Sequence, residues 1–481
     1  MSQKCNFTVI EASSQRHFTE EFFPMTCPIR LSLVAVALCC TMATPLYAKD
    51  VTISSEELAA MRAQLSAMNA RIDQLEAEVA AAKAANEVQD ASIAQQAEAV
   101  ATLPAAKEPE TKITWKGAPE IEGKGGWSFK PRGRLQFAAG IIDAPDSTGV
   151  ADGFGKEVRR LRLGAEGDIP GGFGYKFEFD FAGNDVDVTD AIFTYRDDGL
   201  LVSLGHQNTF QGLEELTSGR FTSLIERAAF TDAFNFERRL GLAVQVSTGD
   251  MLLQGGLFAD NIEDLSNRNW SADGRVVYLP KIGQSQLHLG ASVHYADLEP
   301  GGSVRYRQRP FLHFTSSRFI DTGSLDANSE FGIGLEAALI HGPFHAAAEG
   351  YRQKLSRPSS LGSPAFSGAY AEVGYFLTRG DTRGYKSGVF DRVKPTSPVD
   401  EGGIGAIQLV MRYDYLDLND AGVIGGKQNG FLVGLVWTPT DYTRFLLNYA
   451  SLQYDDAVIP AADGDRDYTV NAFGVQAQVD F

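Results

Sequence analysis

The chain has 481 residues, of which 44% are hydrophobic and 10% aromatic, and its formal net charge is −18 at pH 7. So acidic a balance argues against a general nucleic-acid-binding protein, because contact with the phosphate backbone requires an excess of lysine and arginine. The length allows several domains or one large β structure, and the 49 glycines suit a chain with many strands and turns.

Residues 25–48 read "MTCPIRLSLVAVALCCTMATPLYA" and have the features of a secretory signal. Arg30 provides a positive start, and the apolar run that follows is too short to span a bilayer as a helix. We predict that residues 1–48 are a signal peptide with a start codon placed too early; an unusually long n-region is the alternative. All four cysteines lie in this segment, which excludes a disulfide framework in the mature chain.

Residues 49–103 are rich in Ala, Glu and Gln, with apolar side chains at spacings of three and four. The first seven such positions are Leu58, Met61, Leu65, Met68, Ile72, Leu75 and Val79. This is the a/d pattern of a coiled coil, so we expect a periplasmic helix that self-associates. A single surface helix is the alternative. We interpret residues 104–126, which begin with "PAAKEPETK", as a linker.

Residues 127–481 contain many short stretches in which apolar and polar side chains alternate. In "GYKFEFDFAG" the side chains of Tyr175, Phe177 and Phe179 share one face, and Lys176 and Glu178 share the other. Such stretches indicate a transmembrane antiparallel β-barrel, and the terminal Phe481 is typical of outer-membrane proteins. A soluble β-sandwich is the alternative, but it would need a second sheet to cover the aromatic faces.

The stretch "VRRLRLGAEGD" (158–168) fits a barrel strand. Leu161 and Leu163 would face lipid, whereas Arg160 and Arg162 would face a water-filled lumen. Arg159 has lipid-facing parity, where an arginine costs about 2–4 kcal/mol at the midplane. We therefore expect Arg159 near a strand end or on a local bulge.

The strand count constrains the remaining topology. It is odd if "VRYRQRPFLHF" (304–314) spans the membrane, whereas bacterial single-chain barrels have an even number of strands. We therefore place residues from about 296 to 330 in one long external loop. The barrel then has about sixteen strands, with both termini on the periplasmic side.

No catalytic pattern accompanies these features. The seven histidines do not form a metal-binding spacing, and neither a GxSxG motif nor a Walker loop is present. We predict no enzyme activity, no metal and no cofactor.

Over residues 127–481 the sequence resembles the phosphate-selective porins of the O/P type. The resemblance rests on the order and spacing of "EVRRLRLGAEGD", "TDAIFTY", "GLEELTSGRFTSLIERAAF", "RYRQRP", "DTG", "GYFLTRGDTRGY" and "MRYDYLD". It implies a homotrimer of sixteen-stranded barrels in the bacterial outer membrane, and an inward loop after the fifth strand, at about 208–231. It places Arg220 at the constriction and further pore arginines at Arg134, Arg159, Arg160, Arg305, Arg307 and Arg309.

Together, the lumen-facing Arg162 and these arginines predict a passive porin for anions such as phosphate or polyphosphate. A planar guanidinium can hold a phosphate through two hydrogen bonds. One alternative is a general or other-solute pore in which the arginines pair with facing carboxylates and brace the wall. Another is an envelope tether, because the helix would reach about 70 Å and could contact the cell wall.

Overall fold

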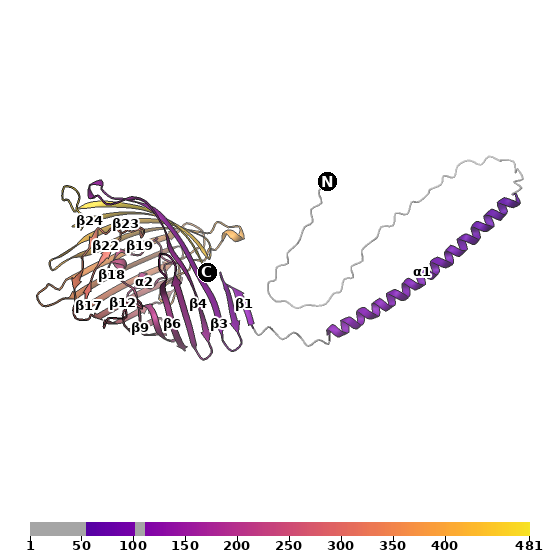
Figure 1. The fold of residues 1–481 in the computed structure, drawn as a ribbon, viewed down its shortest axis with the longest axis horizontal. Coiled ribbons are helices and arrows are strands. Elements are labelled where there is room, and N and C mark those ends of the chain that lie inside the picture. Colours follow the sequence, from indigo (N-terminus) through magenta and orange to yellow (C-terminus); the bar gives the residue numbers. More distant parts are fainter. Residues whose placement is uncertain (1–53, 102–110) are drawn as a thin grey trace. The chain divides into compact units, whose positions relative to one another are not determined.

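The computed structural model describes residues 54–101 and 111–481. The predicted signal peptide, with its cysteines, lies outside the described residues. The chain divides into two compact units, Met1–Leu103 and Pro104–Phe481. The first contains the helix α1 and the second contains the strands (Figure 1).

Helix α1 covers Ser55–Ala101, which confirms the long N-terminal helix. The apolar side chains at the predicted a and d positions are all exposed, among them Leu65 (55%) and Ile72 (48%). Within the described residues, no helix has the length and apolarity needed to cross a membrane. Within the described residues, the apolar seam of α1 is therefore left exposed to solvent.

The segment 104–126, interpreted as a linker, contains secondary structure from Thr111 onward. Strands β1 (Thr111–Trp115) and β2 (Pro119–Gly123) form an antiparallel hairpin, and β2 also pairs with the start of β3. Cross-strand pairing of Ile113 with Ile121 supplies the apolar contact that a short alternating pattern can provide. The hairpin thus extends the sheet of the second unit toward the N-terminus.

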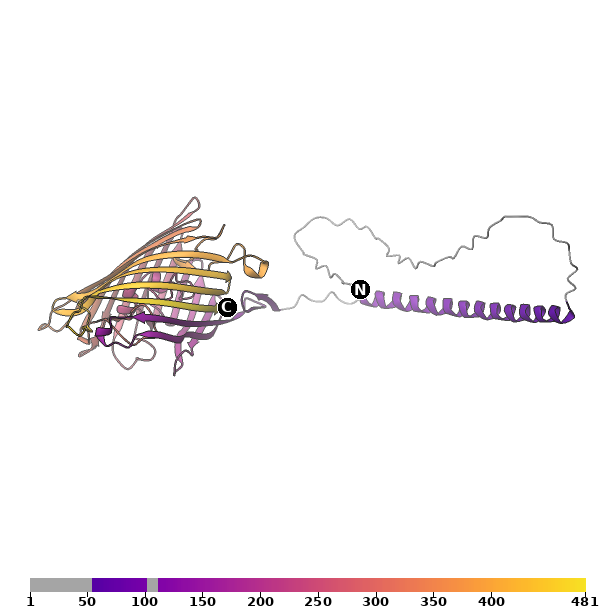
Figure 2. The same ribbon diagram turned by 90° about the horizontal axis from the view of Figure 1, so that it is seen from above.

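Sixteen strands within residues 111–481 form the closed antiparallel barrel. The first eight are β3 (Ser128–Asp143), β4 (Gly153–Ile169), β5 (Phe173–Asp180), β6 (Asp187–Asp197), β7 (Leu200–Asn208), β8 (Arg238–Thr248), β9 (Met251–Phe258) and β10 (Trp270–Tyr278). The second eight are β12 (Ser285–Asp297), β17 (Ser329–His341), β18 (Phe344–Ser356), β19 (Ala365–Phe376), β22 (Ala406–Asp420), β23 (Val423–Thr440), β24 (Thr443–Asp455) and β25 (Tyr468–Asp480). Strand β25 pairs with β3 and closes the barrel, and Figure 2 shows the last strands, in yellow, running side by side.

The alternation of side chains separates the two faces of the wall, as the sequence predicts. On β5, Glu178 (5% exposed) and Asp180 (8%) point inward, whereas Phe177 is 40% exposed. On β25, Val475 and Val479 are exposed and Gln476 and Gln478 are buried. Apolar residues therefore cover the outer face, which meets lipid. The inner face carries polar residues on these stretches and apolar ones, such as Leu432 and Leu452, where the inserted loops pack against it.

The connections differ at the two ends of the barrel. Several turns at the end that carries the C-terminus are short, such as 198–199, 249–250 and 342–343. This is the pattern of a periplasmic end, with longer loops at the external end. The connection 377–405 is the exception, because it is long and contains the hairpin β20 (Gly384–Lys386) and β21 (Val389–Asp391).

The loop between β12 and β17 confirms the predicted topology. Residues 298–328 do not span the wall and contain only two-residue strands: β13 (Ser303–Val304), β14 (Arg307–Gln308), β15 (Ile320–Asp321) and β16 (Leu325–Asp326). Another two-residue strand, β11 (Lys281–Ile282), pairs with the start of β12. Leu312 of this loop packs beside Gly140 and Gly474 of the inner wall, where any Cβ would come within about 2.7 Å of it. The loop therefore tucks into the barrel, where glycine leaves room for it.

Candidate functional site

A β-bulge on β4 carries Arg159 into the lumen. Arg160 pairs with Gln136 and Val158 with Phe137, so Arg159 is the extra residue without a partner on β3. Its guanidinium donates hydrogen bonds to Glu226 at 2.5 and 3.0 Å. Both Arg159 and Arg160 therefore point inward, and the lipid-facing parity of Arg159 is resolved by the bulge.

The loop after the fifth barrel strand crosses the lumen and is longer than predicted. It covers 209–237, rather than ending near 231, and includes the short helices α2 (Leu213–Leu216) and α3 (Ala229–Ala233). Three wall side chains on distant strands accept hydrogen bonds from its backbone. These are Glu349 from Leu213 and Glu214 (2.8 and 2.7 Å), Asp414 from Ala229 (2.9 Å) and Asn448 from Ile225 (2.8 Å). We call this segment the crossing loop.

The crossing loop also meets the 377–405 connection, which enters from the periplasmic end. Arg383 donates to the carbonyl of Phe221, and the amide of Phe390 donates to the hydroxyl of Thr217 at 3.2 Å. Arg275 on β10 holds Gly388 by a further hydrogen bond of 2.9 Å. Much of the barrel interior is consequently filled by these two segments.

One open region is a strongly basic cavity of about 300 Å³ between the crossing loop and the wall of β3–β8. Among the described residues, eight cationic side chains and two carboxylates line it. The cations are Arg132, Arg134, Arg160, Arg162, Lys176, Arg220, Arg227 and Arg238, and the acids are Glu178 and Asp190. Four predicted pore residues, Arg134, Arg160, Arg162 and Arg220, thus converge on one cavity despite the acidic chain.

Ser218, Gly219 and Arg220 of the crossing loop line this cavity. The Ser218 hydroxyl accepts weak hydrogen bonds from Arg134 (3.4 Å) and Arg220 (3.2 Å). The guanidinium of Arg160 lies beside Gly219 and donates to Gln136 at 2.8 Å. Arg134 is 7% exposed, its nearest carboxylate oxygen in Glu178 is 4.0 Å away, and its Nε has no hydrogen-bond partner. These guanidiniums therefore retain donors that a solute could use.

Other predicted arginines are neutralised by close carboxylates. Arg162 donates to Asp180 (2.7 Å) and Glu178 (3.2 Å), Arg159 pairs with Glu226, and Arg305 pairs with Asp321. Arg220 is only partly neutralised, because its nearest carboxylate oxygen, in Asp480, lies 3.6 Å from its guanidinium. The wall-bracing interpretation thus describes Arg162 better than it describes Arg134 or Arg160.

The remaining predicted residues line two other cavities. Arg159 and Arg309 line one of about 160 Å³ with Glu226 and Asp232. Arg305 and Arg307 line another of about 350 Å³ in which carboxylates and guanidiniums are mixed. The eight predicted arginines therefore do not form one site.

Arg227, which the sequence analysis missed, lines both the basic cavity and the 160 Å³ cavity. It donates to the carbonyls of Glu214 (2.9 Å), Glu215 (3.1 Å) and Thr217 (2.8 Å), so it shapes the crossing loop from within. Arg132, Lys176 and Arg238 were missed as well. Inward parity on β3 and β5 identifies Arg132 and Lys176, but the fold of the crossing loop is needed to find Arg227.

Burial and charge act on the ionisable groups of the crossing loop. Burial raises the pKa of Glu226, but the charge and hydrogen bonds of Arg159 outweigh it and hold the pKa at about 2. Burial raises the pKa of Glu215, and Arg227 only partly opposes this. Burial and the nearby Arg132 lower the pKa of Arg220. The Arg159–Glu226 pair is therefore ionised throughout the neutral range.

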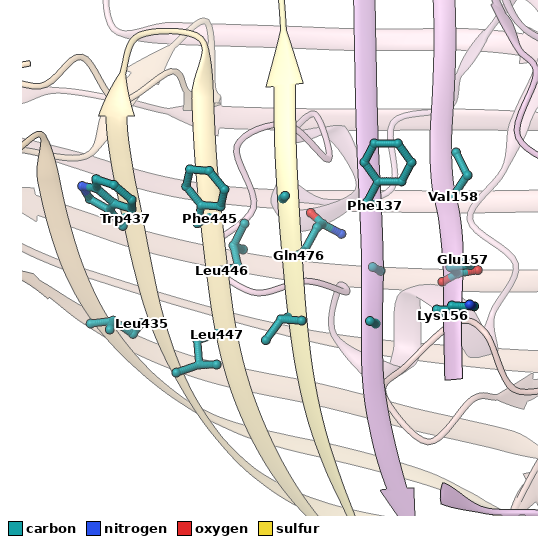
Figure 3. A pocket seen from close by; sticks show the side chains of 14 residues that line it. Phe137, Lys156, Glu157, Val158, Leu435, Trp437, Phe445, Leu446, Leu447 and Gln476 are labelled. Carbon is teal, nitrogen blue, oxygen red and sulfur yellow. The ribbon is translucent and has the colours of Figure 1, made fainter. Parts of the chain in front are cut away.

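A hollow of about 850 Å³ lies on the outer wall and is not part of the pore. Outward-pointing apolar side chains line it, including Phe137, Leu435, Trp437, Phe445 and Leu447 (Figure 3). Such a surface suits contact with acyl chains or with another protein wall. In the part of the chain that the structure describes, no group of His, Cys, Asp and Glu side chains is arranged to hold a metal ion.

Comparison with known proteins agrees with this architecture. Residues 129–481 match the family described as "Phosphate-selective porin O and P". The chain belongs to this family. It is also 45% identical over 483 residues to an uncharacterized protein of Caulobacter vibrioides (strain ATCC 19089 / CIP 103742 / CB 15), covering 94% of this chain and 97% of that one. The protein is therefore a porin of the bacterial outer membrane and not an enzyme.

Solved structures with a similar fold include other outer-membrane channels. An anion-selective porin from Comamonas acidovorans is 14% identical with a TM-score of 0.47, covering 74% of this porin and 100% of that chain. The outer membrane channel DcaP of Acinetobacter baumannii is 13% identical with a TM-score of 0.47, covering 75% and 99%. A trimer form of OmpT from Vibrio cholerae is 11% identical with a TM-score of 0.47, covering 74% and 100%.

Proposed function

We propose that this porin conducts small anions in preference to cations, with phosphate or polyphosphate as the leading solute. The supporting observation is the basic cavity beside the crossing loop, in which Arg160 has no ionic partner and Arg134 has only Glu178 at 4.0 Å, whereas the other six cations of its lining pair with carboxylates. The local field at the narrow part of a pore governs ion preference more than the net charge of the chain. The formal charge of −18 is therefore compatible with an anion pore.

The arrangement around Ser218 favours an oxyanion over chloride. Arg134, Arg160 and Arg220 approach one turn from different elements, and planar guanidiniums suit the oxygens of a phosphate group. Several weak sites in series allow entry without trapping, which conduction requires. Arg227, between two cavities, would pass the anion from one to the next.

The reversal potential of single channels in a potassium chloride gradient tests the proposal. We expect the wild-type reversal potential to lie closer to the equilibrium potential of chloride than to that of potassium. We also expect added phosphate to reduce the chloride current. Arg220→Ala should lower the anion-to-cation permeability ratio several-fold and relieve the block by phosphate. The matched control is Arg268→Ala, an exposed arginine outside the basic cavity, which should behave like the wild type.

A wild-type channel that prefers cations, or that is indifferent to charge, would contradict the proposal. In that case the arginines brace the wall, and the pore admits solutes by size. Anion preference without phosphate block would retain the anion pore and exclude phosphate as its leading solute.

We also propose a homotrimer as the working assembly, with the α1 helices of three copies joined through their apolar seams. The exposed seam residues Leu65 and Ile72 support self-association, because a regular apolar stripe on a long helix is stable in water only when covered. Domain limits of 1–48 for the signal and 49–103 for the coiled coil belong to the same proposal. Contact of the coiled coil with the cell wall is a further role compatible with its length.

A further inference from the structure

Two cations lie on the outer face of β18, a position that the pore does not explain. Arg352 and Lys354 have the outward parity of Ala348 and Gly350, whereas Gln353 between them is 2% exposed and points into the barrel. Both side chains are exposed, and within residues 111–481 neither makes a hydrogen bond or an ion pair. Lipid-facing cations are costly in a barrel wall, so two such cations without ionic partners are unexpected.

The position of the two cations along β18 indicates which part of the lipid layer they contact. β18 ends at Ser356 on the external side, so Lys354 and Arg352 lie two and four residues below that end. Four residues of strand correspond to about 13 Å before tilt. The cations therefore lie in the outer part of the wall, where the head groups of outer-leaflet lipids begin.

Small side chains cover the outer face of the wall below the cations. Ala346, Ala348 and Gly350 continue the outward face of β18, and Ala369 and Ala371 lie across from Gly350 and Ala348 on β19. A Cβ added to Gly350 would meet nothing within 4 Å, so the surface is open there.

Larger outward side chains border these small residues on both sides. On β17, Ile333 lies across from Arg352 and Leu335 from Gly350, and on β22, Tyr413 lies across from Ala371. Ile333, Leu335 and Tyr413 are 49%, 65% and 40% exposed. A strip of small residues therefore descends from the cations between larger side chains, and we call this strip the trough.

No carboxylate within residues 111–481 forms an ion pair with either cation. Two nearby acids on β22 have other partners. Asp417 pairs with Lys427 at 3.2 Å and accepts from Tyr415, and Asp420 accepts from the amide of Ala365, the residue across from Lys354, at 2.7 Å. Ser367 and Ala365 of β19 lie between these acids and the cations and leave them accessible.

We infer that Arg352, Lys354 and the trough below them form a binding site for an acylated lipid of the outer leaflet that carries a phosphate head group. The two cations bind the phosphate, and the trough receives one acyl chain. Charge complementarity at the external end and apolar contact below it select this occupant over a soluble anion, which gains nothing from the trough.

Native mass spectrometry of the full mature protein in detergent, with added diphosphoryl lipid A, tests the inference. We expect a retained lipid adduct, and at least tenfold weaker binding by the double variant Arg352→Gln, Lys354→Gln. The matched control is Arg196→Gln with Lys281→Gln, which removes two exposed cations near the periplasmic end, one at the end of β6 and one in β11. Gly350→Phe should weaken binding by filling the trough, and heat-modifiable migration on gels checks that each variant is folded.

Dephosphorylated lipid A and inorganic phosphate distinguish the alternatives. Equal binding of the dephosphorylated lipid, or unchanged binding by the folded double variant, would overturn the inference. Displacement of lipid A by millimolar inorganic phosphate would mean a surface site for free anions instead. The reversal potential should be the same in the double variant and the wild type, so failure here leaves the proposed anion pore untouched.

Discussion

At the scale of single residues, the proposed anion preference depends on whether an arginine has a close carboxylate. Arg162 has two, at 2.7 and 3.2 Å, whereas Arg160 donates only to the neutral Gln136. A guanidinium without an ionic partner keeps its charge available to a solute, and a paired one is held in the wall. Two arginines on one strand therefore differ in their partners, and we expect only Arg160 to offer its charge to a solute.

The Arg159–Glu226 pair predicts how acid affects the pore. The pKa of Glu226 is held at about 2, below the usual value near 4.3, so its ionised form stabilises the fold by about 3 kcal/mol. This stability is fully present above about pH 4.5 and is lost as the pH falls toward 2. We expect the unfolding temperature to fall between pH 4.5 and 2.5 by more in the wild type than in Glu226→Gln. Glu263→Gln, at an exposed loop position, should retain the wild-type slope.

At the scale of elements, the crossing loop determines the pore, and wall side chains hold it. Glu349, Asp414 and Asn448 come from three separate strands and accept backbone N–H groups that would otherwise be buried without partners. The loop is fixed along its length, so we expect a pore with steady conductance.

Two asparagines on neighbouring strands test this fixation. Asn448→Ala leaves the amide of Ile225 without an acceptor, at a cost of about 1–3 kcal/mol. We expect larger fluctuations of the single-channel current and weaker anion preference. Asn429→Ala on β23 removes an outward asparagine that accepts from Tyr413 and should leave both properties unchanged. Equal currents in both variants would show that Asn448 does not hold the loop.

At the scale of the whole molecule, the exposed seam of α1 predicts assembly. The double variant Leu65→Asp, Ile72→Asp places charges in the seam, whereas Ala63→Asp, Ala70→Asp places them outside it. Light scattering in detergent should show that the seam variant dissociates to monomers at a lower temperature, with barrels that still conduct. The other variant should keep the wild-type mass, and equal masses for both would exclude the coiled coil as the assembly device.

The sequence alone determined the barrel, its sixteen strands, the long helix and the lumen-facing arginines. These depend on side-chain period and on the cost of placing charge in lipid, which are local properties of each strand. The tertiary structure decided the bulge at Arg159, the hairpin at 111–123, the 377–405 connection inside the barrel and the role of Arg227. These depend on hydrogen bonds between residues far apart in the chain, such as Glu349 with Leu213 and Arg383 with Phe221. Whether an arginine meets a carboxylate or an open cavity is settled by the same long-range contacts.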